Sequence, residues 1–165
     1  MQLVVLQPPY PVAETSEAAM ACLEWQRQKL AALAPDETDF VLLPEYANAP
    51  GLSAPHLLDF VRDPGAHFVA DLSGEARRLE AWLVAGIAVE HGGVLRNRTV
   101  VFSPEGGTAG HYDKVHLPAA EAEMGLVAGA EIPVLDLGML RLGVATCFDV
   151  YFPEHFAALA AQLPD

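Results

Sequence analysis

Basic residues and cysteines are scarce in this sequence. Nine lysines and arginines stand against 22 acidic residues, which gives a formal net charge of −13 at pH 7. Because such a surface repels phosphate groups, we expect neither nucleic acid nor an anionic membrane as a partner. The two cysteines, Cys22 and Cys147, are far apart and form no Cys-x-x-Cys pair. Free thiols fit a reducing compartment, so we expect a cytoplasmic protein.

Long apolar runs are missing as well. The longest, at residues 40–43 and 82–89, are much shorter than the ~20 residues that cross a membrane. Residues 1–7 have neither a basic start nor a small-residue cleavage site, and we expect no secretory signal there. The apolar fraction of 52% and the charged fraction of 19% predict one globular domain with a buried core.

The alternation of short apolar runs with helical stretches predicts an α/β protein with a mixed sheet. Residues 46–71 are expected to be loop-like because of their prolines and glycines, with one short helix inside. The turn at residues 91–93 predicts a hairpin. Strands are expected at residues 3–6, 40–43, 83–90, 98–103, 132–137 and 140–146, and helices at residues 14–33, 56–62, 73–82 and 153–163.

Two reactive residue types directly follow apolar runs. Glu45 comes after "FVLLP" and Cys147 after "LRLGVAT". Ligands of open α/β sheets bind beyond the carboxyl ends of the strands. Taken alone, however, such a glutamate is usually a solvated strand end, and such a cysteine is more often an inert buried residue.

The setting of Cys147 favours a nucleophile. A strand-to-helix turn exposes its side chain, and the N–H of Phe148 suits an oxyanion. The helix dipole is expected to lower the pKa of the thiol. Asp149 would oppose a thiolate unless that carboxylate is engaged elsewhere.

A third segment, "GHYDKVHLP" at residues 110–118, contains Lys114. On its own this residue is best interpreted as a surface lysine. His111, Asp113 and His116 are metal-ligand types, but their spacing matches no familiar ligand motif. We therefore expect no metal.

Together, "LLPEYA", "YDKVHLP" and "CFDVYFPE" resemble, in order and separation, the nitrilase superfamily of carbon–nitrogen hydrolases. "RNRTVVFSPEGG" at residues 96–107 is similar to the family's stretch before the lysine. The resemblance implies an α-β-β-α sandwich of two mixed sheets with helices outside. It also implies an amidase or nitrilase that acts on a small molecule without metal or organic cofactor.

The same resemblance implies a triad of Glu45, Lys114 and Cys147. Cys147 would attack an amide carbon and form a thioester, and Glu45 would transfer the protons. Lys114 and the backbone N–H of Phe148 would stabilise the oxyanion.

A second glutamate of the family follows the lysine. Glu121 is preferred over Glu123 because it lies four residues before Gly125, as in similar sequences. Asp149 is expected to anchor the turn at the cysteine, and His116 to support the lysine segment.

Domains of this family are longer than this sequence, so residues 1–165 are expected to form a carbon–nitrogen hydrolase domain that is incomplete after the helix following Cys147. Because that helix is rich in Ala and Leu, we expect a homodimer or a larger even assembly that buries it. Three alternatives stay open: a non-catalytic remnant or assembly module of the same fold, a nitrile hydrolase, and a cysteine–histidine hydrolase with His155 as its base.

Overall fold

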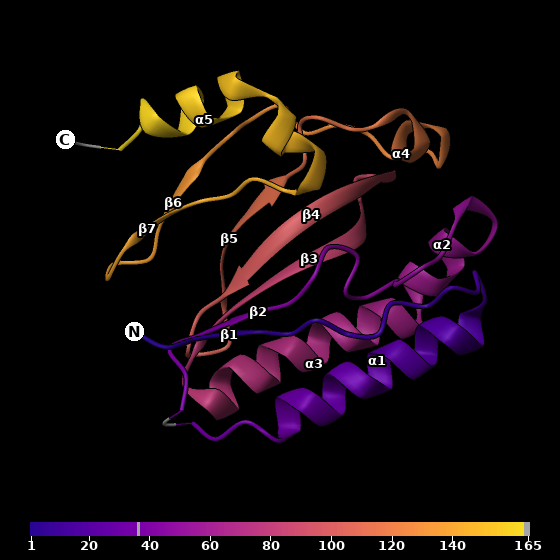
Figure 1. Ribbon diagram of the computed structural model, residues 1–165, viewed down its shortest axis with the longest axis horizontal. Coiled ribbons are helices and arrows are strands. Elements are labelled where there is room, and N and C mark those ends of the chain that lie inside the picture. Colours follow the sequence, from indigo (N-terminus) through magenta and orange to yellow (C-terminus); the bar gives the residue numbers. More distant parts are fainter. Residues whose placement is uncertain (36, 164–165) are drawn as a thin grey trace.

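The computed structural model describes residues 1–35 and 37–163. Four layers are visible in Figure 1: helices α1 and α3, a five-stranded sheet, a two-stranded sheet, and helix α5. The strands are β1 Leu3–Val5, β2 Phe40–Leu42, β3 Trp82–His91, β4 Val94–Phe102, β5 Thr108–Asp113, β6 Val134–Asp136 and β7 Arg141–Gly143. The helices are α1 Ser16–Ala31, α2 Ala54–Arg62, α3 Pro64–Leu79, α4 Ala119–Glu123 and α5 Pro153–Ala160, with a short 3₁₀ helix η1 at Cys147–Tyr151.

The larger sheet is mixed and has the order β1-β2-β3-β4-β5. Its strands β1, β2 and β3 run parallel, whereas β3, β4 and β5 pair antiparallel. Strands β6 and β7 form a separate antiparallel pair. The α/β class, the mixed sheet and the β3–β4 hairpin are therefore confirmed.

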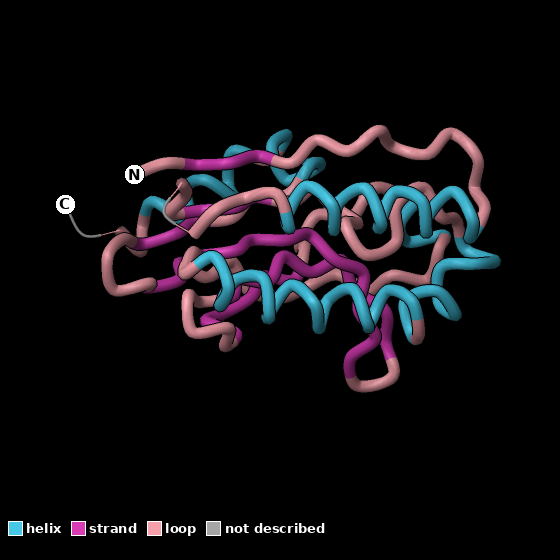
Figure 2. The backbone as a smooth tube through the Cα atoms, turned by 90° about the horizontal axis from the view of Figure 1, so that it is seen from below, coloured by secondary structure: helices cyan, strands magenta, loops and turns pink. Residues whose placement is uncertain are grey.

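Two apolar interiors hold the layers together. The larger lies between the five-stranded sheet and the pair α1 and α3, which lie side by side in Figure 2. A smaller cluster, which includes Phe40, Val84 and Val101, lies between the two sheets. None of the helices in residues 1–35 and 37–163 combines the length and the apolar character that crossing a membrane requires.

The prediction of a loop up to residue 71 is wrong. Helix α3 begins at Pro64, well before the expected start at residue 73. A proline costs nothing in the first turn of a helix, where its missing N–H would have no partner. Gly65 is needed there for packing, because a Cβ atom on it would lie 2.9 Å from the carbonyl oxygen of Asn48. These two residues therefore start a helix here.

Two further elements, β5 and α4, were not predicted. β5 is an edge strand with mostly exposed residues, so it lacks the apolar run by which a buried strand is recognised. α4 is a single five-residue turn of helix. Both elements matter to the site, because β5 leads into Lys114 and α4 carries Glu121.

Candidate active site

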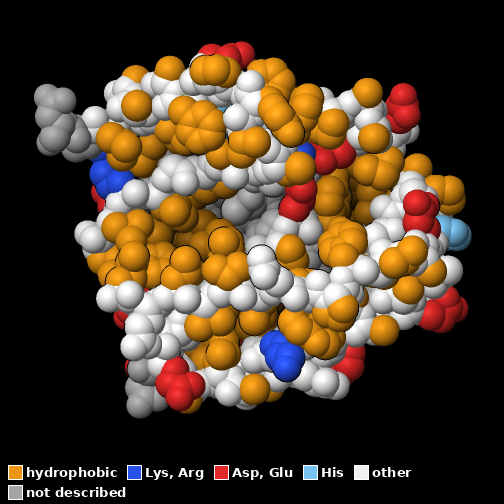
Figure 3. All heavy atoms as spheres, viewed as in Figure 1, with side chains coloured by type: hydrophobic (Ala, Val, Ile, Leu, Met, Phe, Trp, Pro, Cys, Tyr) orange, Lys and Arg blue, Asp and Glu red, His pale blue; other side chains and the backbone are white. Residues whose placement is uncertain are grey.

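The residues after β2 and after β7 meet in one pocket. Glu45 and Cys147 both line this cavity of about 390 Å³. Its walls are mostly apolar and include Leu42, Val84 and Leu142. In the space-filling view of Figure 3 the surface is hollowed at its centre, with hydrophobic side chains around the hollow and acidic ones beside it. The structure thus brings together two residues that are far apart in sequence.

The backbone of Glu45 lies against Gly86 of strand β3. The N–H of Leu43 donates to the carbonyl of Val84 at 2.8 Å, which continues the strand pairing beyond β2. Gly86 of β3 then faces the chain, and a Cβ atom on it would lie 2.6 Å from the Cα of Glu45. Tyr46 follows with a φ of 55°, and the N–H of Ala47 then donates to the carbonyl of Gly86 at 2.8 Å. A glycine in β3 thereby sets the position of Glu45.

Lys114 is buried, so its interpretation as a surface lysine is wrong. Its Nζ donates to Oε1 of Glu45 at 2.8 Å and to Oε1 of Glu121 at 2.7 Å, and the residue is 1% exposed. Burial by itself lowers the pKa of Lys114, but the hydrogen bonds from its ammonium to Glu121 and Glu45 outweigh burial and raise it. Lys114 therefore stays charged between two carboxylates.

The preferred glutamate, Glu121, meets Lys114, whereas Glu123 is exposed. Glu121 is buried on α4, which follows Lys114 closely in the chain. Its carboxylate is the second acceptor of the Lys114 ammonium beside Glu45. The narrow choice between the two glutamates thus agrees with the geometry.

Asn97 is a site residue that the sequence reasoning missed. Its Nδ2 donates to Oε1 of Glu45 at 2.7 Å and lies 3.3 Å from both carboxylate oxygens of Glu121. Its backbone carbonyl also accepts the N–H of Lys114 at 2.8 Å. The sequence signal for Asn97 is its place in the "RNRTVV" stretch, which resembles the family but does not indicate a role for this residue.

Cys147 is the first residue of η1, is exposed, and has a φ of 49°. Strand β7 ends at Gly143, so an irregular link, and not a strand, leads into this helix. We name residues 144–149 the Cys147 turn. A left-handed backbone is strained for a residue with a side chain, and such strain concentrates at functional sites.

The expectation of a lowered thiol pKa is wrong. Desolvation in the pocket raises the pKa of Cys147, the negative charge of Glu45 raises it further, and Lys114 opposes both. A five-residue 3₁₀ helix is too short for its dipole to outweigh these effects. Cys147 is therefore a neutral thiol at pH 7 that needs a base.

Asp149 is engaged away from the thiol, as its position next to Cys147 requires. Its Oδ2 accepts the N–H of Thr146 and the hydroxyl of Tyr112, both at 2.8 Å. Its Oδ1 accepts the backbone N–H of His116 at 3.2 Å and lies 2.8 Å from the ring Nδ1 of that histidine. Burial alone would raise the pKa of Asp149, but these hydrogen bonds lower it. One carboxylate thus ties the Cys147 turn to the segment after Lys114.

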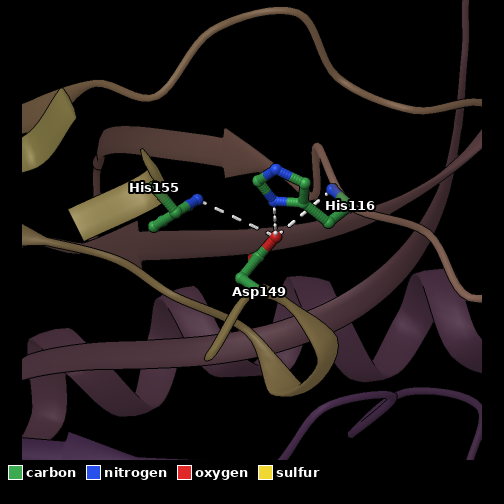
Figure 4. A group of neighbouring side chains, drawn as sticks. All are labelled: His116, Asp149 and His155. Carbon is green, nitrogen blue, oxygen red and sulfur yellow. Dashed lines mark hydrogen bonds and ion pairs between the residues drawn. The ribbon is translucent and has the colours of Figure 1, made fainter. Parts of the chain in front are cut away.

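Three side chains of metal-ligand type lie together here, but they are not the three considered from the sequence. Within the described part of the chain, ligand atoms of His116, Asp149 and His155 lie within 4.8 Å of one another (Figure 4). Asp113 instead forms a two-pronged pair with Arg98 at 2.6 and 3.0 Å. Oδ1 of Asp149 already accepts the backbone N–H of His116, which is a poor arrangement for a metal ligand.

His155 is completely buried and does not line the pocket with Cys147. Its Nε2 lies 2.7 Å from the carbonyl oxygen of Val144. Because a carbonyl oxygen only accepts, this nitrogen carries a proton. Nothing in this geometry supports His155 as a base for the thiol.

Solved structures of carbon–nitrogen hydrolases have the same fold. An amidase from Nesterenkonia sp. matches with a TM-score of 0.80 at 22% identity, over 98% of this chain and 61% of that one. A carbon–nitrogen hydrolase from Helicobacter pylori G27 matches with a TM-score of 0.74 at 22% identity, over 98% of this chain and 56% of that one. The expected nitrilase-like fold is thereby confirmed.

Sequence relatives lead to the same family. A nitrilase from Pyrococcus abyssi is 39% identical over 90 residues, which are 54% of this chain and 34% of that protein. The chain aligns with about a third of the length of the curated relatives it matches. The family model for carbon–nitrogen hydrolases matches residues 3–163, nearly the whole sequence. The resemblance seen in the motifs is confirmed, and the chain belongs to the carbon–nitrogen hydrolase family.

Proposed function

We propose that the protein hydrolyses a non-peptide carbon–nitrogen bond, that of an amide in the first place, through a thioester on Cys147. The observation that carries the proposal is that Glu45, which lines one pocket with Cys147, accepts a hydrogen bond from the ammonium of Lys114. A buried cation, a carboxylate and a thiol are the oxyanion donor, the base and the nucleophile that acyl transfer needs.

The first step begins with the neutral thiol. The hydrogen bonds that reach Glu45 from the described residues, those of Lys114 and Asn97, end on Oε1. Oε2 is then the oxygen that takes the proton of Cys147, while Sγ attacks the carbonyl carbon. The oxyanion that forms is stabilised by the ammonium of Lys114 and the N–H of Phe148, whose place near the start of η1 leaves that N–H without a partner inside the helix.

Collapse of this intermediate breaks the carbon–nitrogen bond. Glu45 gives its proton to the leaving nitrogen, so that ammonia or a neutral amine departs and the acyl group remains on Sγ as a thioester. Water then donates a proton to Glu45 and attacks the thioester carbon. The second oxyanion collapses, the carboxylic acid is released, and Glu45 returns the proton taken from water to Sγ, which restores the thiol and the carboxylate.

Glu121 and Asn97 support this chemistry without contact with the reacting carbon. Glu121 holds Lys114 in its charged form, and Asn97 fixes the carboxylate of Glu45 through Oε1. We assign both as positioning residues. No metal or organic cofactor has a part in the scheme.

The proposal extends to assembly and location. Val150, Tyr151 and Phe156 of η1 and α5 are exposed apolar side chains. Such a surface supports a homodimer or a larger even assembly that buries α5. The free thiols of Cys22 and Cys147 support a cytoplasmic protein.

A haloacetamide tests the nucleophile. A variant of the Nesterenkonia amidase carries the acetamide moiety of fluoroacetamide on its active-site cysteine. With this protein we expect fluoroacetamide to modify Cys147, to leave Cys22 unmodified, and to block hydrolysis of simple amides. Cys147→Ala should fold and hydrolyse nothing, and full activity in this variant would overturn the proposal. Absence of turnover with both amides and nitriles would favour the alternative of a non-catalytic module.

A further inference from the structure

A buried nitrogen of His155 has no partner. The residue is 0% exposed, and its Nε2 donates to the carbonyl of Val144 at 2.7 Å. Its Nδ1 is completely buried and forms no hydrogen bond, yet it lies 3.8 Å from Oδ1 of Asp149. In Figure 4 the rings of His155 and His116 approach the same carboxylate oxygen from different directions. If Nδ1 were bare, a lone pair would face a carboxylate in the protein interior.

Asp149 in turn lacks a full positive charge beside it. Within residues 1–35 and 37–163, its hydrogen bonds come from two backbone N–H groups, the Tyr112 hydroxyl and the His116 ring, and no lysine or arginine pairs with it. These hydrogen bonds stabilise the ionised carboxylate, and a neighbouring cation would in addition neutralise its buried charge. The side chains beside Asp149 that could carry such a charge are the two histidines.

The surroundings favour His155 as the charged one. His116 satisfies Asp149 through a single N–H on Nδ1, and its ring stacks on Phe152 with centroids 3.9 Å apart. His155 needs a second proton to use both of its nitrogens. The titratable groups that face His155 are Asp149 of η1, Tyr112 of β5 and His116, and the rings of the last two meet it edge-on at 5.6 Å. Burial raises the pKa of Tyr112, so this ring is uncharged at pH 7 and does not oppose a second proton on His155.

We propose that His155 is a positioning residue for the nucleophile, held as an imidazolium that donates Nε2–H to the carbonyl of Val144 and forms an ion pair with Asp149 through the protonated Nδ1, 3.8 Å from Oδ1. These two partners lie three residues before and two residues after Cys147. The imidazolium thereby clamps both ends of the Cys147 turn around a residue with a strained φ of 49°. The effect on catalysis rests on the proposed function, but the charge state of the ring does not.

The charge state is tested without substrate. In protein labelled with ¹⁵N-histidine, the shifts of the imidazole nitrogens distinguish a protonated Nδ1 from a bare one, and the signals lost in His155→Gln identify His155. We expect both nitrogens of His155 to carry protons at pH 7. A bare Nδ1 at pH 7 overturns the proposal. Because this result comes from the wild-type protein, it stands even if the variant folds poorly.

The positioning role is tested by kinetics with an amide that the wild-type enzyme hydrolyses. His155→Gln keeps an N–H donor for Val144 but cannot carry a charge. We expect kcat to fall by about 10²-fold, as for a displaced reacting group, with KM nearly unchanged. The wild-type kcat should also fall as the pH is raised through the loss of the His155 proton, and this fall should be missing in the variant.

A matched control is His67→Gln. It removes an exposed histidine of α3 that does not line the pocket. It should keep the wild-type kcat and pH profile. An unchanged kcat and pH profile in His155→Gln would overturn the positioning role. If the wild-type protein hydrolyses no amide or nitrile, the proposed function fails, and the ¹⁵N result alone decides the charge state of His155.

Discussion

Gly86, a residue of strand β3, and Glu45, which follows β2, are in backbone contact. A Cβ atom on Gly86 would lie 2.6 Å from the Cα atom of Glu45 and 3.0 Å from the carbonyl oxygen of Pro44. Backbone cannot yield as the end of a side chain can, so any side chain at position 86 displaces the candidate base.

Gly86→Ala should therefore lower the free energy of unfolding by about 1–3 kcal/mol, as for an overpacked core. It should also lower kcat, because Glu45 moves relative to Cys147. Gly74→Ala is the matched control, since nothing lies within 4 Å of a Cβ atom at this position of α3. There the change should stabilise the protein slightly. Urea unfolding measures the free energy of unfolding of both variants. Equal stabilities of the two variants would contradict the prediction.

Lys114→Met should lower kcat by about 10²–10³-fold, the usual effect of losing one oxyanion donor. It should also destabilise the fold, because Glu45 and Glu121 lose the cation that both of them contact. Lys29→Met is the control, because Lys29 is an exposed residue of α1 over the ring of Trp25. A Lys114→Met variant with wild-type turnover would remove Lys114 from the mechanism.

The negative charge of Glu45 should have a measurable effect on the pKa of the Cys147 thiol. After desolvation, this charge is the next cause of the raised pKa of Cys147. Replacing Glu45 by Gln removes the repulsion of the thiolate, so the pKa of Cys147 should fall while hydrolysis stops. The pH dependence of alkylation by iodoacetamide reports this pKa.

Glu123→Gln, at the exposed end of α4, is the control and should leave the alkylation profile unchanged. A Glu45→Gln profile identical to that of the wild type would mean that the carboxylate does not act on the thiol.

Because of Asp149, the free energy of unfolding should depend on pH in the acid range. Hydrogen bonds hold its pKa in the folded state below the unfolded value of about 3.9. Its contribution is therefore present above that value and lost as the pH falls through the folded-state pKa. Asp149→Asn should cost about 1–3 kcal/mol near pH 7, since buried donors lose a charged acceptor, and less at pH 2–3.

Urea midpoints measured across this pH range test that prediction. Asp59→Asn, which changes an exposed carboxylate of α2, should leave the curve unchanged. A cost for Asp149→Asn that is independent of pH would mean that its effect is not electrostatic.

The sequence was most informative where a reactive residue directly follows an apolar strand. Glu45 and Cys147 directly follow such runs, and their motifs carry the family resemblance, so they could be found without coordinates. The burial of Lys114 could not be predicted in this way. It depends on Asn97 and Glu121, which contact the lysine because of the register of β4 with β5 and the position of α4.

Other errors have the same origin. The Pro64–Gly65 pair has the composition of a loop, and only the contact of Gly65 with Asn48 makes it the start of a helix. The direction of the pKa shift of Cys147 depends first on desolvation and then on the balance between the charges of Glu45 and Lys114, and all three are properties of the folded pocket. Long-range packing decided each of these cases.

The placing of Lys114 between Glu45 and Glu121 leaves this cluster with one unit of negative charge. In the proposed reaction a neutral amide enters and an ionised carboxylic acid leaves. The substrate meets no electrostatic penalty, whereas the product is repelled by the residual charge at close range and by a chain of net charge −13 at longer range. Inhibition by the carboxylate product should therefore be weak. Added salt screens the repulsion, so this product inhibition should become stronger as the salt concentration rises.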